Sequence, residues 1–267
     1  MEQCENGGIV MKKIYYSLVL CILLGLSIPA IGMHIGMNES NYAIDSVKQF
    51  TGNLKIELKA CGYEHTPHAE YVVLFDQNTE YWVNAATYRV ERLSSYGDLD
   101  GCNEVLVTEE EARLIAESLI KAHDEYEKFS DLSLVMNELN DGGDIRTYEF
   151  LWREYLGDVE SPNLVFVSVN PTSGAIIHYI HIDRPIITSL ENNISQEESE
   201  LIAIDQFPGI QSEHIDSKLK IGYDGKGVQR LMWECTVTGQ PRNYIPQGGI
   251  VLIDAHTGEI IRTDTLM

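Results

Sequence analysis

A cysteine and two histidines lie close together in the first third of the sequence, as Cys61, His65 and His68. Thiolate and imidazole are ligands that Zn²⁺ prefers, and three of them leave room for a fourth ligand from elsewhere. The C-x3-H-x2-H spacing falls in a segment that we predict to be a loop. It supports two interpretations, a metal site and an ordinary loop with a free or disulfide-bonded cysteine. We prefer the second, because no further ligand motif accompanies the three residues.

Two other groups of polar residues have simpler explanations than metal binding. His178 and His181 lie three residues apart on a predicted strand, so they point to opposite faces and do not bind one ion together. The stretch 140–144, NDGGD, offers oxygen ligands for calcium. It lacks the twelve-residue spacing and the terminal glutamate of an EF-hand, and it is typical of a tight turn.

The common signatures of catalysis are missing from the sequence. It contains no H-E-x-x-H, no G-x-S-x-G, no Walker glycine loop, no C-x-x-C and no dinucleotide fingerprint. A prediction of hydrolase activity would have to rest on the abundant carboxylates alone. We therefore predict that the protein is not an enzyme and uses no cofactor.

The segment 11–32, MKKIYYSLVLCILLGLSIPAIG, has the pattern of an export signal. Two lysines precede an apolar run, and small residues typical of a signal-peptidase site end it. A start at Met11 instead of Met1 would give a conventional signal. We expect residues 1–32 to be a cleaved signal peptide or an uncleaved anchor. Either alternative places the rest of the chain outside the cytoplasm, secreted or anchored at the membrane by this segment only.

The chain is strongly acidic, with 41 aspartates and glutamates against 19 lysines and arginines and a formal net charge of −22. This charge disfavours nucleic acid and anionic membrane surfaces as partners, because both repel it. It favours solubility, weak cation binding or a basic partner. We therefore expect a protein partner and no nucleic acid.

Three cysteines follow the leader, Cys61, Cys102 and Cys235. An odd number in an exported protein allows one disulfide and one free thiol, and the sequence leaves the pairing open. Three scattered cysteines are too few for a disulfide scaffold, so the stability of the fold must come from the burial of apolar side chains.

One turn sequence occurs three times at a nearly constant interval. Asn84, Asn170 and Asp254 each follow an alternating apolar run, at intervals of 170 − 84 = 86 and 254 − 170 = 84 residues. Such side chains accept hydrogen bonds from backbone amides two residues on. Gly174 and Gly258 supply the positive φ at the end of the second and third turns. The first turn has no glycine at this position. Repetition at a fixed period indicates three copies of one small unit, and we assign these turn residues to the fold and not to function.

Each predicted unit begins with a helix and continues as strands. Thr108 precedes three glutamates as an N-cap, and Ser195 with Glu198 forms a capping-box pattern. The first helix is expected over 42–50. We predict an α+β fold of tandem small units, each a helix packed on a small antiparallel sheet, over residues 40–96, 106–184 and 194–265.

A helix followed by strands and a closing V-x-[VI]-D-x-x-[ST]-G-x-[IV] hairpin resembles the PepSY domain family of peptidase propeptides and YpeB-like proteins. The third unit matches best, through 233–237 and 251–261; the second has Asn170 in place of the aspartate, and the first is degenerate. The resemblance implies a helix on a small antiparallel sheet and no catalytic residues. It also implies a role as a chaperone-inhibitor of secreted metallopeptidases, or as a sensory or assembly module of the cell envelope.

Two aromatic residues suggest where a partner could bind. Tyr148 and Trp152 lie four residues apart on one face of a predicted strand. They form either part of the core or an exposed binding surface. We expect an exported, non-enzymatic binding module that modulates a secreted peptidase or assembles with envelope proteins, using free sheet edges that can add a partner strand. The alternative is an extracytoplasmic sensor of a small ligand or metal ion.

Overall fold

The computed structural model describes residues 37–97, 104–123, 131–141, 146–210, 212–242 and 245–265. The predicted leader, Cys102 and most of the 140–144 turn lie outside these ranges. Within them, no helix is long and apolar enough to cross a membrane.

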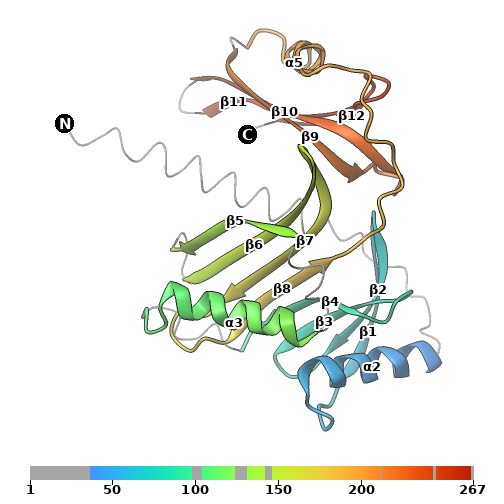
Figure 1. Ribbon diagram of the computed structural model, residues 1–267, viewed down its shortest axis with the longest axis vertical. Helices are drawn as coiled ribbons and strands as arrows, with labels where there is room; N and C mark the ends of the chain where they lie inside the picture. Colours follow the sequence, from blue (N-terminus) through green and yellow to red (C-terminus); the bar gives the residue numbers. More distant parts are fainter. Residues whose placement is uncertain are drawn as a thin grey trace. The chain divides into compact units, whose positions relative to one another are not determined.

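A helix followed by four strands occurs three times along the described chain (Figure 1). The elements are, in chain order, α2 (Met37–Thr51), β1 (Lys59–Thr66), β2 (Ala69–Phe75), β3 (Thr79–Asn84), β4 (Val90–Ser95), α3 (Glu109–Ala122), β5 (Leu132–Asn140), β6 (Thr147–Leu156), β7 (Val159–Val169), β8 (Ile176–Ile182), α5 (Gln196–Asp205), β9 (Ser212–Tyr223), β10 (Gln229–Arg242), β11 (Ile245–Asp254) and β12 (Ile260–Thr265).

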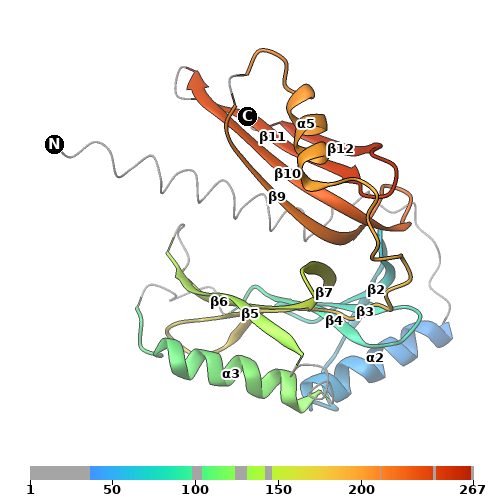
Figure 2. The same cartoon turned by 45° about the horizontal axis from the view of Figure 1, so that its top comes forward.

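The chain divides into two compact units, and the boundary between them runs through β5, β6, β7 and β8. The first unit contains α2, α3 and β1–β4 with most of β5 and β8. Figure 2 shows both helices on the same face of its sheet. Ala43 and Val47, one helical turn apart on α2, pack against the inward alternation of Val72, Leu74 and Val83. Each fully buried valine or leucine contributes about 1.5–3 kcal/mol, so this apolar layer fixes α2 on the strands.

The second unit contains α5 and β9–β12 together with the first part of β7. Alternate residues of β10 point to the face that α5 covers, and among them Leu231, Trp233 and Cys235 are buried. Ala203 of α5 and Phe207, just after it, belong to the same apolar cluster. The residues of β10 that alternate with Leu231, Trp233 and Cys235 lie on the opposite face, as the two-residue period of a strand requires.

The expected fold class is wrong. The strands do not form tandem small antiparallel sheets. They form one twelve-stranded sheet, in which ten strands follow the order β1-β2-β3-β4-β8-β7-β9-β10-β11-β12 and β6, with β5 beside it, branches from β7. The edge of β4 pairs antiparallel with β8 through Arg92↔Ile180 and Leu93↔Tyr179. The edge of β9 meets β7 in parallel at Glu160↔Lys220, which makes the sheet mixed. Alternation within a strand specifies its buried face but not the strand beside it, so sequence patterns missed both junctions.

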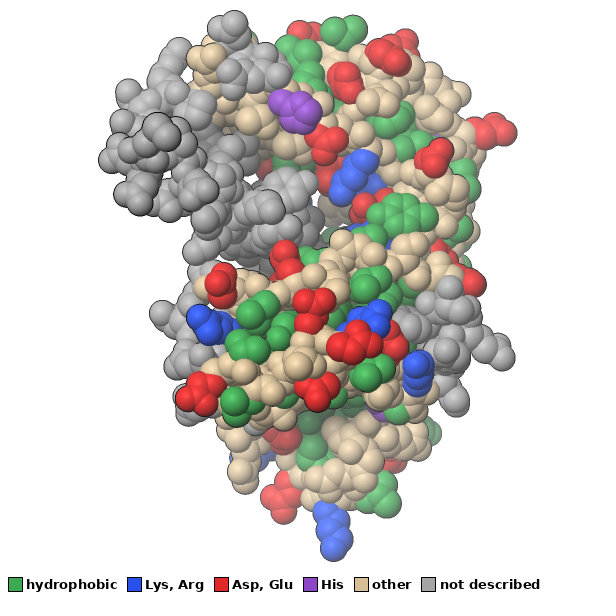
Figure 3. Space-filling view, turned by 60° about the vertical axis from the view of Figure 1, so that its left-hand side comes forward, with side chains coloured by type: hydrophobic (Ala, Val, Ile, Leu, Met, Phe, Trp, Pro, Cys, Tyr) green, Lys and Arg blue, Asp and Glu red, His purple; other side chains and the backbone are tan. Residues whose placement is uncertain are grey.

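The two aromatic residues predicted as a binding surface are buried. Tyr148 is 5% exposed and Trp152 is 4% exposed. Their common strand face is therefore part of the interior, and core packing is the correct alternative for both. On the face in Figure 3, acidic side chains are spread among exposed apolar ones.

Candidate functional site

The structure does not bring Cys61, His65 and His68 together as a metal site. The segment expected to be a loop is strand β1, and four residues of strand separate Cys61 from His65 by about 13 Å. His65 instead forms an ion pair with Glu70 of β2, with 3.0 Å between Nδ1 and Oε1. His68 lies in the turn that joins the two strands. Across the described ranges, no group of three or more histidine, cysteine, aspartate or glutamate side chains is arranged to hold a metal ion.

The two described cysteines after the leader are free thiols in contrasting environments. Cys61 is exposed, whereas Cys235 is buried in the core beneath α5. Burial raises the pKa of the Cys235 thiol, and its sulfur lies 3.5 Å from the Ser199 hydroxyl. A buried thiol with a raised pKa is a poor nucleophile, so Cys235 acts as a small core residue.

The two histidines of β8 are also explained by the fold. The Nδ1 atom of His178 lies 3.3 Å from the Ser94 hydroxyl on the neighbouring strand β4. Burial lowers the pKa of His178, which favours the neutral ring. His181 is buried as well, so both residues belong to the packed sheet.

The three predicted turns have the same hydrogen bonds. The side-chain oxygen of Asn84 accepts from the amides of Ala86 and Thr87, at 2.9 and 3.1 Å. Asn170 accepts from the amides two and three residues on at 2.8 and 3.1 Å, and Asp254 does so at 2.9 and 3.0 Å. In each turn, the carbonyl of the same residue also accepts from the amide four residues on. These side chains hold the hairpins in place.

The last residue of each turn has a positive φ. It is +74° at Gly174 and +76° at Gly258, where glycine carries no steric cost. The first turn places Tyr88 at this position with a φ of +56°, and its ring packs at 5.2 Å from that of Tyr42 on α2. The aromatic contact with the helix accompanies a backbone conformation that tyrosine rarely adopts.

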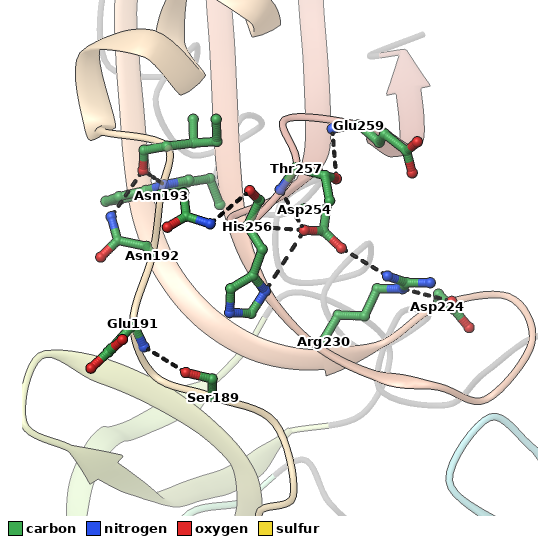
Figure 4. Close-up of polar contacts among 12 residues, drawn as sticks. Ser189, Glu191, Asn192, Asn193, Asp224, Arg230, Asp254, His256, Thr257 and Glu259 are labelled. Carbon is green, nitrogen blue, oxygen red and sulfur yellow. Dashed lines mark hydrogen bonds and ion pairs between the residues drawn. The ribbon is translucent and has the colours of Figure 1, made fainter.

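The third turn carries an additional charge network (Figure 4). The Arg230 guanidinium donates to Asp254 and to Asp224, each at 2.8 Å. The hydrogen bond from Arg230, together with backbone amides, lowers the pKa of Asp224 to about 2. Burial opposes ionisation of Asp254, but the amides of His256 and Thr257 and the Arg230 side chain outweigh it and lower the pKa of Asp254. The network fastens the β9–β10 turn to the β11–β12 turn.

Three strands have one edge that no other described strand covers: β1, β12 and β5. The edge of β1 is interrupted by a register shift between Ala60 and Gly62. The pairing of β12 with β11 is also shifted, and β12 exposes the charged Arg262. Bulges and charges are devices that protect a sheet edge from pairing with another chain. Both ends of the path are therefore protected.

Strand β5 lacks this composition. Its sequence, LSLVMNELN, has a single charged residue, Glu138. Leu134 is 38% exposed and Val135 is 44% exposed, so apolar side chains are exposed on both faces of the strand. Among the described strands, β5 pairs only with β6. We identify this open, apolar edge as the candidate interaction site. Sequence analysis missed it, although the run of four apolar residues within 132–136 was a usable signal.

Carboxylates surround the candidate edge. Asn137 of β5 donates to Glu109 of α3 at 2.8 Å, and Asn140 donates to Glu149 of β6 at 2.9 Å. Burial raises the pKa of Glu149, and the nearby charge of Glu138 raises it further. A segment that pairs with β5 therefore meets apolar side chains and negative charge together.

No protein-family model matches it, and no curated protein sequence matches it. Among solved structures it is similar to the Bacillus megaterium YpeB C-terminal domain, with 17% sequence identity and a TM-score of 0.41, covering 88% of this chain and 100% of that chain. This likeness is compatible with the PepSY resemblance of the sequence, and at these values we base no argument about function on it.

Proposed function

We propose that this protein is a non-enzymatic, extracytoplasmic binding module that takes an extended segment of a protein partner along the open edge of β5. The observation that carries the proposal is the exposed apolar edge of β5 beside two protected edges, β1 and β12. An extended segment adds to such an edge through main-chain hydrogen bonds, and its alternate side chains supply specificity.

The chemistry around β5 defines the partner segment. Leu134 and Val135 favour apolar side chains on the added strand, and Glu138 favours lysine or arginine next to them. Each new main-chain hydrogen bond contributes about 0.5–1.5 kcal/mol, so several of them together with two apolar contacts give useful affinity. The export pattern of the sequence supports a partner among secreted peptidases or envelope proteins. The metal-sensor alternative gains no support, because the ligands predicted for it lie apart.

The proposal is tested by capture from the native cell envelope and culture fluid, with the tagged chain purified as its own cells export it. Leu134→Lys and Val135→Lys place a charge on the open edge, as protected edges do. We expect each to reduce recovery of the captured partner about tenfold, measured by mass spectrometry.

The matched control is Thr263→Lys, which adds the same charge to the exposed edge strand β12. It should leave recovery unchanged, and hydrogen exchange should slow at the β5 amides when the partner is bound. Equal recovery by all variants, or protection confined to other strands, would contradict the proposal.

A further inference from the structure

A second apolar surface lies at the start of α3. Leu106, Val107, Glu111, Leu114 and Ile115 line an open hollow of about 450 Å³. Leu106 is 66% exposed and Leu114 is 51% exposed. Four of the five lining residues are apolar, so the hollow places leucine side chains in water.

The floor of this hollow is held by backbone hydrogen bonds. The amides of Leu106 and Val107 both donate to the carbonyl of Pro171 in the β7–β8 turn, at 2.9 and 2.8 Å. The Ile115 methyl lies so close to Gly174 that a Cβ there would be 3.0 Å from it. A floor fixed in this way is formed before anything binds, which lowers the entropic cost of binding.

The corresponding place on α5 has the same kinds of residue, Ile194, Glu198, Leu201 and Ile202, at four of the five lining positions and differs at the position of Leu106. The amides of Asn193 and Ile194 donate to Ala255 at 2.9 and 3.0 Å, as those of Leu106 and Val107 do to Pro171. The same capping box follows, from Ser195 to Glu198. The residue at the position of Leu106 is Asn193, and its side chain donates to a carbonyl of the turn at 3.1 Å. A polar residue serves the structure equally well there, so Leu106 needs another explanation.

Negative charge lies beside the hollow. Glu111 is in its lining, and Glu109 and Glu110 are exposed in the first turn of α3, where Glu109 accepts from Asn137 of β5 and Glu110 pairs with Arg113. Hydrogen bonds from the Thr108 backbone and hydroxyl lower the pKa of Glu111 and keep it ionised. A second copy of this chain would bring another net charge of −22, so charge disfavours self-association here.

We infer that this hollow docks a segment of another protein that presents neighbouring apolar side chains flanked by lysine or arginine. The leucines accept the apolar side chains, and the glutamates attract the cations and set the direction of approach. The site is separate from the β5 edge, and it stands whether or not β5 adds a strand.

The probe is a fluorescein-labelled synthetic peptide of leucine and lysine with the leucines on one helical face, followed by anisotropy with the protein as exported. Leu106→Asn installs the residue of the α5 site, and Leu114→Gln removes the second leucine. We expect each to weaken binding about tenfold. Leu201→Gln is the matched control, because Leu201 has the same place on α5 and is 65% exposed. It should leave binding within about twofold.

Four results of the binding assay overturn the inference. The first two are a loss of binding with Leu201→Gln equal to that with Leu114→Gln, and no loss of binding with either hollow variant. The third is equal binding of a peptide with glutamate in place of lysine. The fourth is loss of binding with Val135→Lys, which would place the peptide on β5. A dimer in sedimentation that Leu106→Asn dissociates would assign the hollow to a second copy and also overturn it. Circular dichroism melts should coincide, since exposed substitutions change stability by within about 0.5 kcal/mol.

Discussion

The start of α3 and the start of α5 are built alike, but one has the exposed Leu106 where the other has Asn193. Both begin with a capping box, and before each helix two backbone amides donate to the carbonyl of the residue that follows the turn asparagine or aspartate. Gly174 lies beneath Ile115, and Gly258 lies beneath Ile194 and Ile202. The difference between the two regions is confined to side chains that the backbone bonds do not use. This difference separates the residues that the fold requires from the residues that can have another role.

The turn acceptors differ in the same way. Asn170 and Asp254 are both buried and both accept from turn amides, so the turn needs only an oxygen at this position. Aspartate in the third turn brings a charge, and Arg230 pairs with it. The negative charge of Asp254 therefore serves the ion pair with Arg230 in the second unit, and the hydrogen bonds of the turn do not require it.

The largest effect in this comparison is expected at the turn glycines. Gly174→Ala and Gly258→Ala force alanine into a left-handed conformation, which costs about 1–2 kcal/mol. Gly174→Ala should cost more, because its Cβ would lie 3.0 Å from Ile115, against 3.4 Å from Ile194 at Gly258. Urea unfolding measures both. Gly225→Ala is the control, since no atom lies within 4 Å of its Cβ position. A cost at Gly225 equal to that at Gly174 would refute this account.

A smaller effect is expected when the third turn is made like the second. Asp254→Asn keeps an oxygen for the turn amides but faces Arg230 with an amide, and should destabilise the protein by about 1 kcal/mol at pH 7. The pKa of Asp254 is lowered in the fold, so the stability from its charge is present above the usual carboxyl pKa and is lost as pH falls through the folded pKa. Thermal melts of the variant and the wild type should therefore converge in acid. A gap that persists to the lowest pH would contradict the role given to the charge.

The smallest effects on stability are expected at two largely buried carboxyl groups, Glu149 in the first unit and Glu234 in the second. Burial raises the pKa of Glu149, whereas Lys220 and Lys218 outweigh the burial of Glu234 and lower its pKa. Glu149→Gln should stabilise the protein at pH 7, and the gain should shrink as pH falls toward the usual glutamate pKa of 4.5, where the wild-type group takes up its proton.

Glu234→Gln should have the opposite sign at pH 7, because it removes a paired charge, and its cost should disappear in acid. Each change should stay within about 1 kcal/mol. Melts over a range of pH measure both variants. The same sign for the two would show that the lysines do not decide the charge state of Glu234.

Short-range features of the fold were predictable. The N-cap at Thr108 and the capping box at Ser195 are confirmed, because each depends on residues three apart in the chain, and Thr108 forms a full capping box as well. The first helix extends beyond the predicted 42–50, to Met37–Thr51, since propensity alone sets helix ends poorly. The candidate site was not predicted: the open edge of β5 depends on which strands lie beside it.

The sequence by itself determined the local chemistry of this protein: the turn acceptors Asn84, Asn170 and Asp254, the helix caps at Thr108 and Ser195, and the strong negative charge. Each follows from residues a few positions apart, where hydrogen-bond reach and side-chain period suffice. The tertiary structure decided the rest. It joined β4 to β8 and β7 to β9, buried Tyr148 and Trp152, and left β5 and the hollow beside α3 exposed. Those outcomes depend on contacts between residues far apart in the chain, and no local pattern encodes the identity of a distant neighbour.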